Sequence, residues 1–254
     1  MFKGFFGPED TANACGMFTV PHIISLIVCL ALVGVSIYMI TKISDTSLIK
    51  ITKILAIVFT VTEIIKIIYK IVYSYTEYLD YYLPISFCSL FIYALWFYGF
   101  GKGAIKKVGE AFIAGGCIVG GMAFLIVPAT SLMMHPIFHY LSFHSMLIHS
   151  AMVVMGVTLL LRNKTELNKN TFLYFGAYVT SAAFIAIVLN LITSSNLMLL
   201  SFPLNIPIDF VNRVAAKIPA LYTVVLYLIY LIIPYSVAVI IQKIIIKCKK
   251  ASVE

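Results

Sequence analysis

The chain has 254 residues, of which 62% are apolar and only 11% are charged. Soluble domains carry about 25% charged residues to cover their surface, so this chain would expose large apolar patches in water. The composition therefore excludes an ordinary water-soluble domain, and the mean hydropathy of +1.04 points to lipid as the surrounding solvent.

Seven apolar runs follow one another along the chain, each about long enough to cross the roughly 30 Å hydrocarbon core as a helix. Helices are expected because backbone groups in lipid must form their hydrogen bonds within their own segment. The runs are too continuous for barrel strands, whose apolar residues alternate. The predicted spans are residues 20–41, 50–73, 83–100, 107–127, 142–161, 172–194 and 220–246. We therefore predict that residues 1–254 form a single all-α transmembrane bundle of seven helices.

The net charge of +8 is distributed along the chain in a pattern that indicates topology. Thirteen basic residues fall in the first, third and fifth connections and in the tail after residue 242. The opposite side holds only Lys3, Arg213 and Lys217. The positive-inside rule then places the amino terminus outside and the carboxyl terminus in the cytoplasm. Because the charges border membrane spans, they argue against a nucleic-acid partner.

Polar side chains inside the spans are the candidates for function, because an ionisable group in lipid costs free energy and faces the bundle interior. With the predicted topology, such groups gather in the outer half of the membrane, from four different spans. They are Glu63, Cys88, His144, His149 and Asn190, with Asn196 just beyond the last of these spans. Groups that converge in this way are a requirement of catalysis.

Each of these residues also has a purely structural interpretation. Glu63 lies three residues before Lys66 and can form a buried ion pair with it. His144 and His149 are five residues apart, about 140° around a helix, so both cannot face one centre. Cys88 alone fits a small core residue. The asparagines can serve as hydrogen-bond links between helices, and the glycine pairs at 115–116 and 120–121 are typical of closely packed helices.

One segment resembles a known signature. Residues 83–90, Leu-Pro-Ile-Ser-Phe-Cys-Ser-Leu, are similar to the LPxxxC motif of the YwaF-type integral membrane family, which includes animal phospholipid acyltransferases. Further features match in order along nearly the whole chain: His22, Glu63, His149 followed by Ser150, Asn190, Asn196-Leu197-Met198 and Pro203. Two positions depart from the family pattern, where members commonly have histidine in place of Ser86 and an aromatic residue in place of Leu197. The chain thus resembles a divergent member of that family.

The resemblance implies a function and its residues. Cys88 and His149 would be the catalytic pair, with the thiolate forming an acyl-thioester that a lysolipid hydroxyl then resolves. We expect their reactive atoms to lie about 3–4 Å apart. Asn190 or Asn196 would donate to the oxyanion, and Glu63 would orient His149. The resemblance further implies membrane phospholipids as partners, no metal or other cofactor, and a multi-pass protein of the bacterial plasma membrane.

Three other functions stay open on the sequence alone. A small-solute transporter or a membrane receptor could use Glu63, Lys66 and the histidines, since polar groups near the midplane mark substrate paths. A metal-dependent lipid hydrolase could use His135 and His139, which have ligand spacing but flank Pro136, together with His144 or His149. A retinal protein is disfavoured because residues 220–246 have no lysine near their centre.

Overall fold

The computed structural model describes residues 2–8, 12–73, 82–204 and 208–251. All the regular secondary structure in these residues is helical, with no strand among them. The helices are α1 (Phe2–Phe5), α2 (Val20–Thr41), α3 (Asp45–Val72), α4 (Leu90–Phe100), α5 (Gly103–Ile126), α6 (Tyr140–Leu161), α7 (Lys169–Thr193), the short 3-10 helix η2 (Leu197–Leu199), α8 (Asp209–Lys217) and α9 (Pro219–Ala251). The all-helical prediction is confirmed for this part of the chain.

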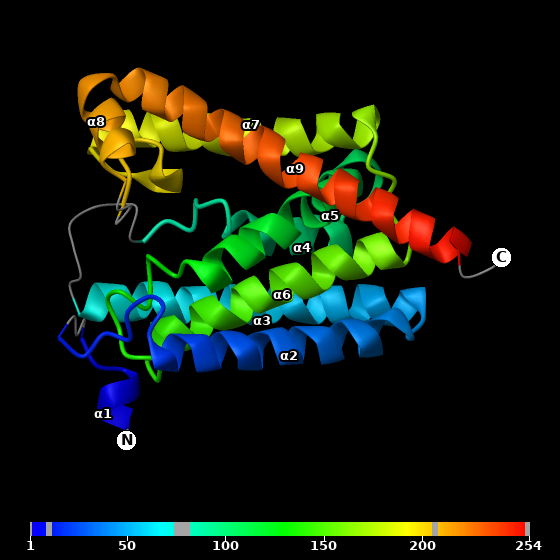
Figure 1. Cartoon of the computed structure of the whole chain (residues 1–254), viewed down its shortest axis with the longest axis horizontal. Coiled ribbons are helices and arrows are strands. Elements are labelled where there is room, and N and C mark those ends of the chain that lie inside the picture. The colour runs from blue at the N-terminus through cyan, green and yellow to red at the C-terminus, as the bar shows by residue number, and fades with distance from the viewer. Residues whose placement is uncertain (1, 9–11, 74–81, 205–207, 252–254) are drawn as a thin grey trace.

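The long helices run side by side along the longest axis of the molecule (Figure 1). Helices α2, α3 and α6 form one flank, and α7 and α9 form the other. Helix α5 lies between the flanks and packs against α4, α6, α7 and α9. Helix α1 and the carboxyl-terminal end of α9 lie at opposite ends of this axis.

Among the residues that the structure describes, five helices meet both the length and the composition required to cross a membrane: α2, α5, α6, α7 and α9. They coincide with five of the predicted spans. Helix α3 is long enough, with 28 residues, but it carries Lys50, Lys53, Glu63, Lys66 and Lys70. Helix α4 is apolar but has only 11 residues. The seven-span count and the orientation of the ends therefore stay predictions.

The predicted third span is longer than the helix observed there. Residues 83–89 form turns, and α4 begins only at Leu90. Pro84 has no N–H to donate, and the Ile85 N–H binds the Leu83 carbonyl at 2.8 Å in a local turn. The start of this span was predicted wrongly because an apolar turn and an apolar helix have the same hydropathy.

Glycines allow α5 to approach its neighbours closely. A Cβ added at Gly121 would lie 2.6 Å from the His149 carbonyl oxygen, and one at Gly109 would lie 2.5 Å from the Ala94 carbonyl oxygen. At Gly120 an added Cβ would lie 2.9 Å from the ring of Phe87. The close packing predicted for the glycine pairs is confirmed, and it places α6 and the turn before α4 directly against α5.

Polar contacts tie three helices together at the opposite end from the amino terminus. The Arg162 guanidinium donates to the Asp45 carboxylate at 2.5 Å and to the Ile40 carbonyl at 3.1 Å. Lys164 also donates to Asp45, and this hydrogen bond lowers the pKa of the Asp45 carboxyl below its ordinary value. The ends of α2 and α6 and the start of α3 are thereby joined.

Candidate functional site

Cys88 lies in the tight turn that precedes α4. The Ser86 hydroxyl accepts the Ser89 N–H at 3.1 Å, and the Leu90 N–H binds the Ser86 carbonyl at 3.1 Å, so the turn is held from within. The neighbouring Phe87 is buried and its ring stacks on Tyr230 of α9, with centroids 5.2 Å apart and planes at 14°. The half-buried Cys88 packs against the apolar core, within electrostatic range of Cys117 on α5.

His149 has one ring nitrogen engaged and one available. Its Nδ1 lies 2.6 Å from the Ser145 carbonyl oxygen, which can only accept, so Nδ1 carries the proton. Its Nε2 is buried and has no hydrogen-bond partner among the described residues. The ring stacks on Phe124 of α5, with centroids 3.6 Å apart and planes at 9°. The structure therefore presents an imidazole of fixed orientation whose Nε2 is unpartnered.

Phe87, the residue before Cys88, and His149 pack against neighbouring glycines of α5. A Cβ added at Gly120 would lie 2.9 Å from the Phe87 ring, and one at Gly121 would lie 2.6 Å from the His149 carbonyl oxygen. No hydrogen bond joins the Cys88 thiol to His149 Nε2, so the predicted direct contact is absent in this conformation.

Glu63 contacts Lys66 and His144, although His149 was the expected partner. It forms an ion pair with Lys66, and its second carboxylate oxygen lies 3.6 Å from His144 Nε2. The Glu63–Lys66 pair considered from the sequence is thus confirmed. The Glu63 carboxylate lies beside His144, and no contact between this carboxylate and His149 is found among the described residues. Because the two histidines lie about 140° apart on α6, one faces α3 and the other faces α5.

The two asparagines hold a loop that folds back between α7 and α8. Asn190 exchanges two hydrogen bonds with the backbone of Leu197, at 2.7 and 3.1 Å. Asn196 donates to the Phe202 carbonyl at 2.9 Å and accepts the N–H groups of Ser201 and Phe202. The structure thus uses both amides to support this loop, whereas the sequence had suggested links between helices. It shows no contact that would aim them at Cys88.

Helix α9 supports the same loop through residues that sequence reasoning missed. The hydroxyls of Tyr222, Thr223 and Tyr230 donate to the carbonyls of Leu199, Leu200 and Met198 at 2.9, 2.7 and 3.1 Å. Non-helical backbone within a membrane needs such partners. The available signal was the presence of hydroxyl side chains in an otherwise apolar run, at residues 222, 223 and 230.

The histidines outside this region are engaged in structural contacts. His139 Nδ1 accepts the Leu141 N–H, and its Nε2 lies 3.0 Å from the Gly7 carbonyl and 3.1 Å from the Tyr69 hydroxyl. Burial lowers the pKa of His139. His22 bonds the Phe18 N–H and the Leu125 carbonyl, which fixes α2 to the end of α5. Within the described residues no group of three or more metal-ligating side chains gathers.

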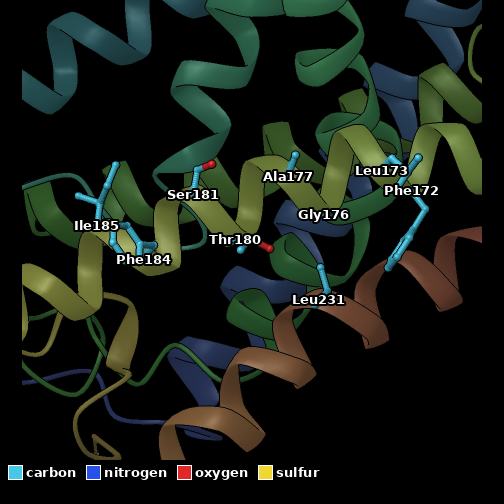
Figure 2. Close-up of a pocket in the computed structure, with 9 residues that line it drawn as sticks. All are labelled: Phe172, Leu173, Gly176, Ala177, Thr180, Ser181, Phe184, Ile185 and Leu231. Carbon is cyan, nitrogen blue, oxygen red and sulfur yellow. The ribbon is translucent and has the colours of Figure 1, made fainter.

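A separate apolar groove of about 740 Å³ runs along α7 beside α9 (Figure 2). It does not include the residues discussed above. Its outer rim, with Leu173 and Phe184 each 67% exposed, is on the flank that a bilayer would cover with lipid tails. The groove is lined by Phe172, Leu173, Gly176, Ala177, Thr180, Ser181, Phe184, Ile185 and Leu231.

The fold and the buried polar groups define a multi-pass helical membrane protein with a polar site inside the bundle. A protein-family comparison then gives the particular family: the model of the TMEM164 family matches residues 17–240. The chain belongs to this family of membrane proteins. A search of curated proteins and a search of solved structures each returned no match.

Proposed function

We propose that the protein is a membrane-embedded acyltransferase that moves phospholipid acyl chains through Cys88, as the resemblance of residues 83–90 to the YwaF-type family implies. The observation that carries the proposal is the buried, unpartnered Nε2 of His149, whose ring is oriented by the hydrogen bond from Nδ1 to the Ser145 carbonyl. A free imidazole nitrogen inside an apolar bundle is a base without an evident structural task. His149 packs against the same stretch of α5 as Phe87, the residue before Cys88.

The chemistry requires two steps at one thiol. His149 Nε2 takes the Cys88 proton, and the thiolate attacks an ester carbonyl of a phospholipid. The S–C bond forms, the C–O bond to glycerol breaks, and the departing oxygen takes the proton from His149. In the second step a lysolipid hydroxyl attacks the thioester, the C–S bond breaks, and His149 carries the proton back to sulfur. The residues need no metal and no nucleotide for these steps.

The proposed reaction also requires a change of conformation around Cys88. Since no hydrogen bond joins thiol and imidazole in this structure, binding of the lipid must bring Cys88 Sγ and His149 Nε2 together. Catalytic hydrogen bonds are often long in free enzymes and tighten with substrate bound. The turn that carries Cys88 directly precedes α4, a helix of 11 residues, and is the segment that would have to shift.

The proposed setting is a plasma membrane crossed seven times, with the amino terminus outside. Supporting this, the α2–α3 and α6–α7 connections lie at the same end of the bundle as the carboxyl terminus (Figure 1). These connections and the tail hold basic residues, as cytoplasmic segments do. Cys88 and His149 then lie in the half of the bundle toward the outer leaflet, whose phospholipids are the proposed partners.

The decisive experiment follows the acyl-thioester. Purified protein is incubated with a phospholipid that carries a labelled acyl chain, and label that hydroxylamine releases from the protein is measured. Wild type should acquire it, and Cys88→Ser should lose nearly all of it because the thioester needs sulfur. Cys29→Ser and Cys248→Ser serve as matched controls and should retain it. Label that persists in Cys88→Ser would place the nucleophile elsewhere.

A second candidate function rests on Glu63, Lys66 and His144. A buried ion pair with a histidine at 3.6 Å is also typical of ion and solute pathways. If wild type shows no label and no lipid turnover with several donors, transport becomes the better hypothesis. Transport measured in vesicles would then respond to Glu63→Gln and tolerate Cys88→Ser.

A further inference from the structure

The loop between α7 and α8 has a strained backbone. Ser194, Met198 and Leu199 adopt positive φ angles of 54°, 55° and 57°, in the left-handed region that residues with a Cβ occupy at a cost. Such strain persists only where surrounding contacts hold it, and it concentrates at functional sites. Here Asn190 and Asn196 hold the loop from one side and the α9 hydroxyls hold it from the other.

Tyr230 joins this loop to the turn that carries Cys88. Its hydroxyl donates to the carbonyl of the strained Met198 at 3.1 Å. Its ring stacks on Phe87, the residue before Cys88, with centroids 5.2 Å apart. Met198 is 2% exposed and belongs to the same apolar cluster against which Cys88 packs. The loop, Tyr230 and the Cys88 turn therefore form one continuous packed unit.

We propose that Tyr230 is a positioning residue that keeps the 194–200 loop closed over the Cys88 turn and thereby keeps water from the acyl-thioester. The proposal rests on the proposed acyltransferase function. An acyl-thioester has two available acceptors. If a lysolipid hydroxyl attacks, its oxygen bonds to the acyl carbon, the C–S bond breaks and the proton passes to sulfur. If water attacks, the same bonds change and a free fatty acid is released. A site that excludes water favours transfer.

The test compares tyrosines of one helix. Tyr230→Phe keeps the ring on Phe87 and removes only the hydroxyl that holds Met198. Tyr227→Phe is the matched control, because that hydroxyl bonds Thr180 on α7, at 2.7 Å, and not the loop. Each variant receives phosphatidylcholine with a labelled acyl chain and lysophosphatidylcholine as acceptor. The measured quantity is the ratio of labelled free fatty acid to labelled transfer product.

We expect the ratio of free fatty acid to transfer product to rise about fivefold in Tyr230→Phe, because loss of one buried hydrogen bond shifts the opening equilibrium of the loop by about that factor. In Tyr227→Phe the ratio should stay at the wild-type value. Tyr222→Phe, which releases the Leu199 carbonyl of the same loop, should raise it in the same direction and serves if Tyr230→Phe does not fold. Equal ratios in folded Tyr230→Phe and Tyr227→Phe overturn the positioning role alone. A wild type that forms neither thioester nor transfer product overturns the proposed function, and this inference with it.

Discussion

At the scale of single residues, the groups around each ring separate two histidines of α6. His144 and His149 are both buried, and Nε2 of each lacks a hydrogen-bond partner among the described residues. His144 Nε2 lies 3.6 Å from the Glu63 carboxylate, whereas His149 stacks on Phe124 of α5. Because their surroundings differ, the two positions are expected to respond differently to the same substitution.

The substitution is histidine to glutamine at each position. His149→Gln should slow acylation of Cys88 about 100-fold or more, because glutamine cannot take the thiol proton. His144→Gln should stay within about threefold of wild type, since its partner is Glu63. The measurement is the initial rate at which hydroxylamine-sensitive label appears on the protein. Equal losses in both variants would contradict the assignment of His149 as the base.

Sequence reasoning predicted part of this site. The spacing of Glu63 and Lys66 gave the ion pair, and the angle between His144 and His149 gave their opposite directions. The roles of Asn190 and Asn196 were not predictable, because a side-chain amide serves an oxyanion or a backbone equally well until its neighbours are known. Tyr230 was missed because tyrosine is common in membrane helices and only the fold brings it to Met198.

At the scale of elements, hydropathy located the long helices but not how closely they approach. The observed bounds of α2, α5, α6, α7 and α9 lie within a few residues of the predicted spans at most ends. The exception is the segment before α4, where the chain turns while staying apolar. Distances between helices depend instead on which glycines face a neighbouring helix. The sequence alone does not separate these glycines from glycines that face no neighbour.

Two transmembrane glycines provide a matched pair. Gly121→Ala places a Cβ 2.6 Å from the His149 carbonyl and 2.7 Å from Val153, whereas Gly34→Ala on α2 meets nothing within 4 Å. The first should cost about 1–3 kcal/mol of stability through overpacking, and the second should be neutral or slightly stabilising. Thermal unfolding of the detergent-purified variants measures this. A normal melting temperature for Gly121→Ala would mean that α5 and α6 are farther apart than described.

At the scale of the whole molecule, the positions of the basic segments bear on the predicted topology. The basic connections and the tail lie at one end of the bundle, and the amino terminus lies at the other (Figure 1). The contact of Arg162 with Asp45 and Ile40 closes the basic end. The opposite half of the bundle holds Cys88 and His149. This half is covered by the 127–139 segment, the amino-terminal residues and the 194–200 loop. The location of the proposed chemistry therefore depends on which end faces the cell exterior.

Thiol labelling of intact cells tests this orientation. Phe138 is 83% exposed in the segment before α6, so Phe138→Cys in a Cys15→Ser, Cys248→Ser background should react with a membrane-impermeant maleimide. The native Cys248, exposed in the basic tail, should react only after the membrane is permeabilised. The opposite pattern would reverse the topology and move the site to the cytoplasmic leaflet. Reaction of both cysteines in sealed cells would place the two positions on one side and exclude seven crossings, because Phe138 and Cys248 are separated by three predicted spans.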